Sequence, residues 1–304
     1  MIDVFIKSIV YLLIITIGYA LKKLHFFRPT DFTLIARIVC NITIPCAIIT
    51  SFAGFDFAFS LLWFILIGVL SNLLLIFLGF LISARRESEH KAFFMLNMSG
   101  FNFGSFSLPY IQSFFSPTAV VAACLVDMGN SFFCTGGSYA IAAAVMEKRE
   151  KGRMKTFIKR IFSSLPVDVY LVMILLSILG ISLPAFVLTF ADIVGSANAF
   201  LAMLMIGMSL SLQIKKGHVW DITKILFVRF ASMGVLALLL WLLLPLSPEL
   251  KMAIVLVLLS PLTSLNPAYT EQLAGDTALS GQVTSLSILI SAVLMTIIIP
   301  LIQI

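Results

Sequence analysis

Long apolar runs separated by short polar turns make up most of the chain. Ten runs can be delimited, at approximately 4–21, 31–53, 57–83, 91–115, 118–146, 164–182, 185–212, 220–244, 249–273 and 277–302. Each is close to or longer than the roughly 20 residues that an α-helix needs to cross a bilayer. Proline, glycine and charged residues lie between the runs and mark turns. The pattern therefore predicts an all-α membrane protein with ten transmembrane helices.

The composition supports a membrane location. Apolar residues make up 61% of the chain and charged residues only 11%, whereas a soluble domain has about 25% charged residues. We therefore expect the protein to lie in the cell (inner) membrane with lipid as a partner. The net charge of +6 comes from Lys and Arg in short loops, which is a topology signal and predicts no nucleic-acid partner.

Basic residues concentrate on one side of the predicted topology. The turns after the first, third, fifth and seventh runs contain Lys22, Lys23, Arg28, Arg85, Arg86, Lys91, Lys148, Arg149, Lys151, Arg153, Lys155, Lys159, Arg160, Lys215 and Lys216. The opposite side has only Lys7 and Lys251. Because positive loops stay in the cytoplasm, the N-terminus and the C-terminus are both predicted to lie outside.

The chain divides near its middle into two halves. Residues 147–163 form a basic linker between a first repeat, 1–146, and a second repeat, 164–304, and each repeat has five runs. An odd number of helices gives the second repeat the opposite orientation. This plan is typical of secondary transporters built from inverted repeats.

The fourth and ninth runs occupy equivalent places in the two repeats, and both contain helix-breaking residues. The fourth contains Asn102 and Pro109, and the ninth contains Pro261, Asn266 and Pro267. Proline removes a backbone donor, and lipid cannot satisfy the freed groups, so such breaks need protein or a watery cavity around them. Half-helix N-termini at two breaks would attract an anion. We predict a substrate site there; simple proline kinks are the alternative.

Asn41, four residues before Pro45, marks a milder break in the second run and is a further candidate for substrate binding.

Two polar residues in the fifth run are candidates for coupling. Asp127 lies near the middle of the membrane, with Asn130 one turn away on the same face. A carboxylate at this depth costs about 2.5–3.5 kcal/mol, which favours a proton site or a Na⁺ site; a protonated, hydrogen-bonded Asp is the alternative. Arg229 in the eighth run could pair with Asp127 or attract the anion, but we interpret it as extending to the cytoplasmic surface.

The ordered set of these residues resembles the auxin efflux carrier family, which includes the plant PIN proteins and many bacterial transporters. The matching pieces are Asn41-Ile-Thr-Ile-Pro45, Asn102…Pro109, Asp127-Met-Gly-Asn130, Ile206-Gly-Met-Ser-Leu210, Pro261…Asn266 and Ser287…Ser291…Pro300. Plant members have Asn-Pro at both breaks. Here Asn266-Pro267 matches that pattern, but Asn102 is followed by Phe103.

The resemblance implies a fold similar to that of bile-acid:sodium symporters. Helices 1, 2, 6 and 7 would form a scaffold, and helices 3–5 and 8–10 a transport domain. The broken fourth and ninth helices would cross at the substrate site. An elevator-like movement of the transport domain would give alternating access.

The predicted function is secondary transport, by efflux or exchange, of a small organic anion. The alternatives are a sodium-coupled symporter of a larger amphipathic anion and an ion channel. The three histidines, His25, His90 and His218, lie in or beside loops, and no HExxH motif occurs. We therefore expect no enzyme activity, no cofactor and no metal beyond a coupling ion, H⁺ or Na⁺. A second copy of the chain is a further candidate partner.

Overall fold

The computed structural model describes all residues except 1, 29, 55–58, 147–164, 212 and 303–304. The predicted linker 147–163 lies outside the described residues. The described part is helical and contains no strand, apart from one isolated β-bridge. This confirms the all-α prediction.

The helices follow the apolar runs closely. They are α1 (Ile2–Lys23), α2 (Asp31–Ile38), α3 (Ile44–Phe52), α4 (Trp63–Ile82), α5 (Ser88–Met98), α6 (Leu108–Phe114), α7 (Pro117–Phe132), α8 (Ser138–Val145), α10 (Leu165–Ile178), α11 (Ala185–Ser209), α12 (Val219–Leu243), α13 (Pro248–Leu258), α14 (Asn266–Gln272) and α15 (Thr277–Ile302). Three wider, π-helical segments lie between these helices. Val39–Thr43 joins α2 to α3, Phe103–Ser107 precedes α6, and Phe133–Gly137 joins α7 to α8.

Within the described residues, six helical stretches are long and apolar enough by themselves to cross a membrane. They are Asp31–Phe52, Trp63–Ile82, Pro117–Val145, Ala185–Ser209, Lys216–Leu243 and Thr277–Pro300. Leu165–Ile178 is apolar but shorter. The fourth and ninth apolar runs are interrupted, since α5 is separated from α6 and α13 from α14.

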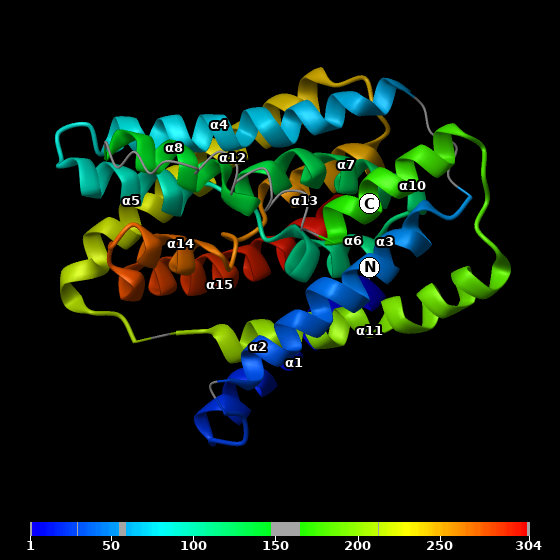
Figure 1. Ribbon diagram of the computed structural model, residues 1–304, viewed down its shortest axis with the longest axis horizontal. Helices are drawn as coiled ribbons and strands as arrows, with labels where there is room; N and C mark the ends of the chain where they lie inside the picture. Colours follow the sequence, from blue (N-terminus) through cyan, green and yellow to red (C-terminus); the bar gives the residue numbers. More distant parts are fainter. Residues whose placement is uncertain (1, 29, 55–58, 147–164, 212, 303–304) are drawn as a thin grey trace.

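The helices pack in two groups (Figure 1). In the first, α11 lies against α1 and α3, and α3 also contacts α10. In the second, α4 packs on α5 and α7, α13 on α7 and α12, and α14 on α15.

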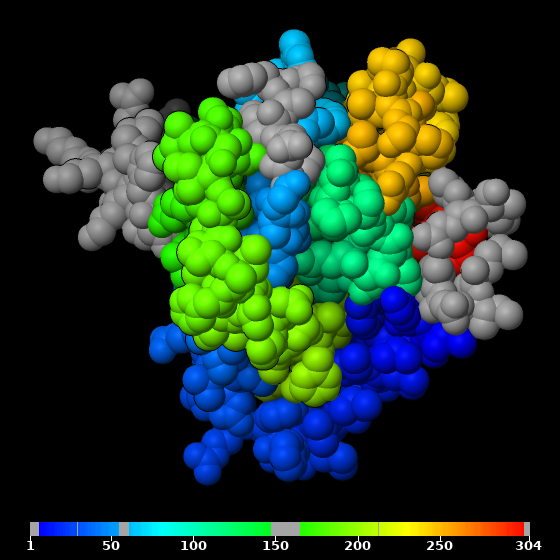
Figure 2. Space-filling view, turned by 90° about the vertical axis from the view of Figure 1, so that its right-hand side faces the viewer, coloured from blue at the N-terminus to red at the C-terminus, as the bar shows by residue number. Residues whose placement is uncertain are grey.

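The α4–α5 turn and the start of α12 lie at the left of Figure 1. We call this the basic end, because Arg85, Arg86, Lys215 and Lys216 lie in its turns. Figure 2 faces the opposite end, where the segment around residue 115 (blue-green) lies between α10 (green) and the α12–α13 turn (orange).

Glycines allow close helix contacts in both groups. A Cβ on Gly18 would lie 2.4 Å from the carbonyl oxygen of Leu204, and one on Gly207 would lie 2.1 Å from that of Ile15. In the second group, a Cβ on Gly68 would lie 2.0 Å from the carbonyl oxygen of Val126. Small residues at such contacts let backbones approach, which is how helices commonly associate in membranes.

The prolines that the sequence suggests as helix breakers are placed in different ways. Pro267 lies in the first turn of α14, and Pro261 lies in the non-helical segment before it. Pro45 and Pro109 lie where a π-helical segment passes into an α-helix, and neither interrupts the helical backbone there. The prediction that Pro109 breaks the fourth run is therefore wrong: the run is broken before Asn102, where Gly100 has a φ of +83°.

Gly68→Ala is expected to lower stability by about 1–3 kcal/mol, the usual result of overpacking, because the new Cβ meets backbone that cannot rotate away. Thermal unfolding in detergent measures the effect. Gly234→Ala is the matched control: Gly234 is also helical, but its Cβ position is open, so stability should hold or rise. Equal stability of both variants would contradict the close α4–α7 contact.

Candidate functional site

The two interrupted helices cross at their breaks, in the middle of the second group. After α5 ends at Met98, the chain runs through Gly100 before turning helical again at Phe103. After α13 ends at Leu258, it stays non-helical until α14. The two segments form an antiparallel bridge between Phe101 and Leu262. The backbone N–H of Asn102 also donates to the carbonyl oxygen of Pro261 at 2.9 Å.

Arg229 of α12 joins the two breaks. Its guanidinium donates to the backbone oxygens of Met98 and Gly100 on one segment, the latter at 3.0 Å. It also donates to Ser260 at 3.2 Å and Pro261 at 3.5 Å on the other. A helix C-terminus leaves carbonyls without intrahelical partners, and a cation there is favourable. One side chain thus serves the C-terminal ends of both α5 and α13.

Arg229 is fully buried, and its guanidinium lies 4.9 Å from the centre of the Phe101 ring. The interpretation that it extends to the cytoplasmic surface is therefore wrong. The suggested pairing with Asp127 is not observed either, because the guanidinium is directed at carbonyl oxygens. The two breaks supply several carbonyl acceptors for the guanidinium inside the protein. The spacing of residues along the sequence does not indicate where these carbonyls lie.

Two asparagines hold the first break from the other side. The amide of Asn130 accepts from the N–H of Phe101 and donates to its carbonyl oxygen, both at 2.9 Å. Asn72 of α4 accepts from the N–H of Gly100 at 2.7 Å and donates to Asn130 at 3.2 Å. Polar backbone at a break must be paired within the protein, and these amides supply that pairing.

Asp127 lies next to this network and is buried. Its carboxylate accepts from Asn130 at 2.8 Å, as the one-turn spacing predicts, and from the hydroxyl of Tyr170 at 3.2 Å. Tyr170 is on α10, in the other group of helices. Tyr170 could not be predicted from the sequence, because nothing in the local pattern around it indicates which helix its hydroxyl faces.

The second break is held by two serines of α15. The hydroxyl of Ser287 accepts from the N–H of Leu262 at 3.0 Å, and that of Ser291 donates to the carbonyl oxygen of Leu259 at 2.8 Å. Asn266 is buried and donates to the carbonyl oxygen of Ser99 at 3.1 Å, which ties α14 to the first break. One of its two side-chain N–H donors is thus used within the protein.

Asn102 is placed differently from Asn266. It donates to the hydroxyl of Ser264 at 3.2 Å across the crossing, and Ser264 lines a cavity. Among the predicted prolines, Pro109 and Pro261 are buried, and Pro267 is partly exposed and lines the same cavity. Asn41 has an exposed side chain that donates to the carbonyl oxygen of Arg37, one turn back on its own helix.

The cavity has a volume of about 560 Å³ and lies between the two groups of helices, toward the basic end. The first group contributes Lys22, His25 and Arg28 from the end of α1 and the following turn. The remaining lining residues are Phe27, Phe32, Met208, Ser209, Ser264, Pro267, Gly281, Thr284 and Ser285. One wall is therefore cationic, and the facing wall carries small hydroxyl side chains of the crossing and of α15.

Comparison with known proteins places the chain among transport proteins. Residues 4–164, more than half of the chain, match the family model of membrane transport proteins, that of the auxin efflux carriers. The chain belongs to this family. An uncharacterized transporter from Methanocaldococcus jannaschii is 24% identical over 230 residues, covering 72% of this chain and 73% of the relative. This auxin efflux carrier family member is thus a multi-pass membrane protein of a transport family and not of an enzyme family.

No group of three or more His, Cys, Asp or Glu side chains that could hold a metal ion occurs in the described part of the chain. The site is instead built from amides, hydroxyls and one buried guanidinium.

Arg229→Met is expected to destabilise the protein by at least about 3 kcal/mol, because several buried carbonyls would lose their donor at about 1–3 kcal/mol each. Thermal unfolding in detergent measures this. Arg37→Met, which removes an exposed arginine of α2, is the control and should change stability little. Wild-type stability of Arg229→Met would show that the breaks do not depend on the guanidinium.

Proposed function

We propose that this auxin efflux carrier family member is a secondary transporter of a small organic anion, working by efflux or exchange. The observation that carries the proposal is the cavity, whose wall of Lys22, His25 and Arg28 faces the crossing of the interrupted helices. Cations facing small hydroxyl donors suit a carboxylate. Asn102 and Ser264 at the crossing would orient the anion.

In the proposed topology the chain crosses the membrane ten times, in two inverted repeats of five helices. The six long helical stretches supply six crossings. α1, α10 and the interrupted pairs α5/α6 and α13/α14 would supply the other four. The basic end would face the cytoplasm, with both termini outside, as the positive-inside rule predicts.

An elevator-like cycle suits the two groups of helices. α1, α2, α3, α10 and α11 would form the scaffold, and α4–α8 and α12–α15 the moving transport domain. The cavity lies between them at the basic end, so the structure corresponds to a state open to the cytoplasm in this proposal. Movement of the crossing past α1 and α11 would carry the anion outward.

Coupling would involve Asp127, through a proton or Na⁺. Its contact with Tyr170 joins the proposed transport domain to the scaffold, so a change in the charge of the carboxylate would alter the strength of that contact. A larger amphipathic anion taken up with sodium is the alternative substrate, which the apolar lining side chains Phe27, Phe32 and Met208 favour.

Lys22→Gln is expected to weaken anion binding roughly tenfold, since one charge-assisted contact is lost. Thermal-shift titration with small mono- and dicarboxylates, auxin-like acids and bile acids, with and without sodium, measures it, because a ligand stabilises the folded state by mass action. Lys23→Gln makes the same charge change on a neighbouring residue that is absent from the cavity lining. If no carboxylate stabilises the wild type, or if both variants weaken binding equally, the proposed anion site is wrong.

Asp127→Asn is expected to abolish gradient-driven uptake in proteoliposomes while leaving thermal stability close to wild type, because the amide can still hydrogen-bond to Asn130 and Tyr170. Asp168→Asn on the same helix as Tyr170 serves as the control and should transport normally. Undiminished uptake by Asp127→Asn, with an unchanged pH profile, would exclude Asp127 as the coupling group.

A further inference from the structure

The segment that connects α11 to α12 lies along the first turns of α15. Ser211 donates its backbone N–H to the hydroxyl of Ser285 at 2.8 Å. The side-chain amide of Gln282 donates to the backbone carbonyl oxygen of Gln213 at 2.6 Å. The residue just before this segment, Leu210, instead accepts from Lys22 of α1 at 2.8 Å. The connection thus changes its attachment from α1 to α15 between Leu210 and Ser211.

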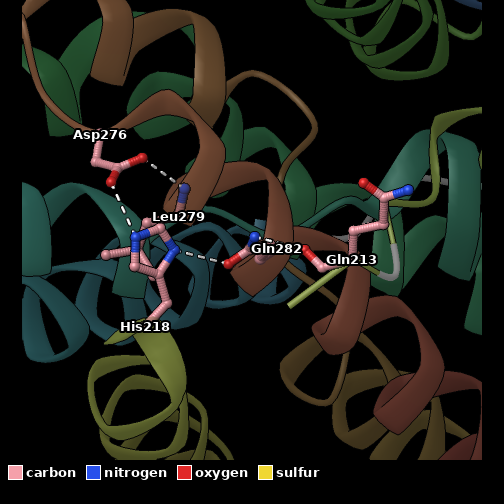
Figure 3. A network of polar contacts seen from close by, with 5 residues as sticks. All are labelled: Gln213, His218, Asp276, Leu279 and Gln282. Atoms are coloured by element: carbon pink, nitrogen blue, oxygen red, sulfur yellow. Dashed lines mark hydrogen bonds and ion pairs between the residues drawn. The ribbon is translucent and has the colours of Figure 1, made fainter. Parts of the chain in front are cut away.

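His218 completes this attachment at the far end of the connection (Figure 3). Its Nδ1 lies 2.8 Å from Oε1 of Gln282, and its Nε2 lies 3.1 Å from Oδ2 of Asp276. The other carboxylate oxygen of Asp276 accepts from the backbone N–H of Leu279 at 2.8 Å, which fixes the carboxylate at the start of α15.

Both ring nitrogens of His218 face acceptors. The carboxylate of Asp276 has no proton to donate when ionised. Gln282 cannot present its NH₂ to the ring, because that group donates to the carbonyl oxygen of Gln213, and the reversed amide would place two oxygens 2.6 Å apart. A neutral imidazole has one N–H and satisfies one of the two contacts. Only the doubly protonated imidazolium makes both.

The charged groups around His218 come from three elements. Asp276 precedes α15 and contacts the ring directly. Lys215 and Lys216 belong to the connection itself. Asp221, in the first turn of α12, lies 3.6 Å from Arg86 in an ion pair. The charged group in direct contact with the ring is therefore the carboxylate of Asp276.

We propose that His218, Gln282 and Asp276 form a proton-operated clamp that fastens the α11–α12 connection to α15. The clamp is closed when the ring of His218 is doubly protonated, and it loosens when the ring becomes neutral. Its regulatory role rests on the proposed function, in which the connection joins the scaffold to the transport domain. A closed clamp holds the connection against α15, which also lines the cavity through Gly281, Thr284 and Ser285.

The direction of the effect follows from the acceptors. Charging His218 adds a hydrogen bond, so acid stabilises the clamped arrangement, and the contact weakens when the ring loses its second proton. The connection is held by α1 at Leu210 and by α15 from Ser211 onward. A closed clamp keeps the rest of the connection on α15, so acidification at the basic end would slow the movement of the transport domain out of the state in which the cavity is open to the cytoplasm.

Hydrogen–deuterium exchange of residues 213–218 in the purified full-length protein tests the clamp without any substrate. Protection of this segment, corrected for the intrinsic rate at each pH, is expected to fall roughly tenfold or more between pH 5.5 and 8, the effect of losing one charge-assisted hydrogen bond. His218→Gln should show no such pH response. His90→Gln removes an exposed histidine of α5 and should respond like the wild type.

A wild-type segment whose protection does not change with pH, or a His218→Gln protein that responds as the wild type does, would overturn the clamp. Asp276→Asn provides a second variant that keeps His218; its pH response should be smaller than that of the wild type. Counterflow in proteoliposomes tests the regulatory role: acid inside should slow wild-type flux and leave His218→Gln flux unchanged, and equal slowing would refute it. Absence of flux for every anion would contradict the proposed function. The result of the hydrogen–deuterium exchange experiment on the clamp would not be affected.

Discussion

The structure depends on pairing the backbone of two interrupted helices without water. Two breaks within one apolar protein leave carbonyl and amide groups that would each cost free energy if unpaired. The guanidinium of Arg229 provides several donors in a fixed plane, and it meets carbonyls of both segments at once. Burying a lone cation is unfavourable, but helix C-termini and the ring of Phe101 supply partial negative charge around it.

Much of the remaining pairing comes from α7 and α15, which flank the crossing, and Asn72 of α4 adds to it at Gly100. Asn130 on α7 binds both backbone groups of Phe101, and Ser287 on α15 binds Leu262. Each break is thus fastened to an unbroken helix as well as to the other break. Movement of the crossing relative to these helices would break several hydrogen bonds together. The crossing, α7, α12 and α15 are therefore expected to move as one body in any transport cycle.

The apolar pattern predicted an all-helical chain, because lipid imposes the same length and polarity on every spanning segment. Proline, glycine and asparagine in the fourth and ninth runs predicted that these two runs are interrupted, but Pro109 does not mark the break. The sequence pattern could not predict how polar side chains pair across helices. Arg229 lies at a depth from which a long side chain reaches the surface, so spacing alone favoured that interpretation. Pro109 follows a π-helical segment, which sequence patterns do not reveal. The partners Tyr170 and Asn72 become apparent only when α4, α7 and α10 are placed side by side.

The hydrogen bonds that pair the two breaks also reduce the number of polar side chains that are available to bind a ligand. Half-helix N-termini and two asparagines were expected to attract the anion. Yet the amide of Asn266 is buried, donates to the backbone of Ser99 and does not line the cavity. Ser264, which accepts from Asn102, lines the cavity, with hydroxyls of α15 beside it. The positive charge comes instead from Lys22 and Arg28, at the end of α1 and in the turn that follows it. In the proposed cycle the anion would therefore be attracted by the scaffold and oriented by the transport domain, so movement of that domain would separate the anion from these cations.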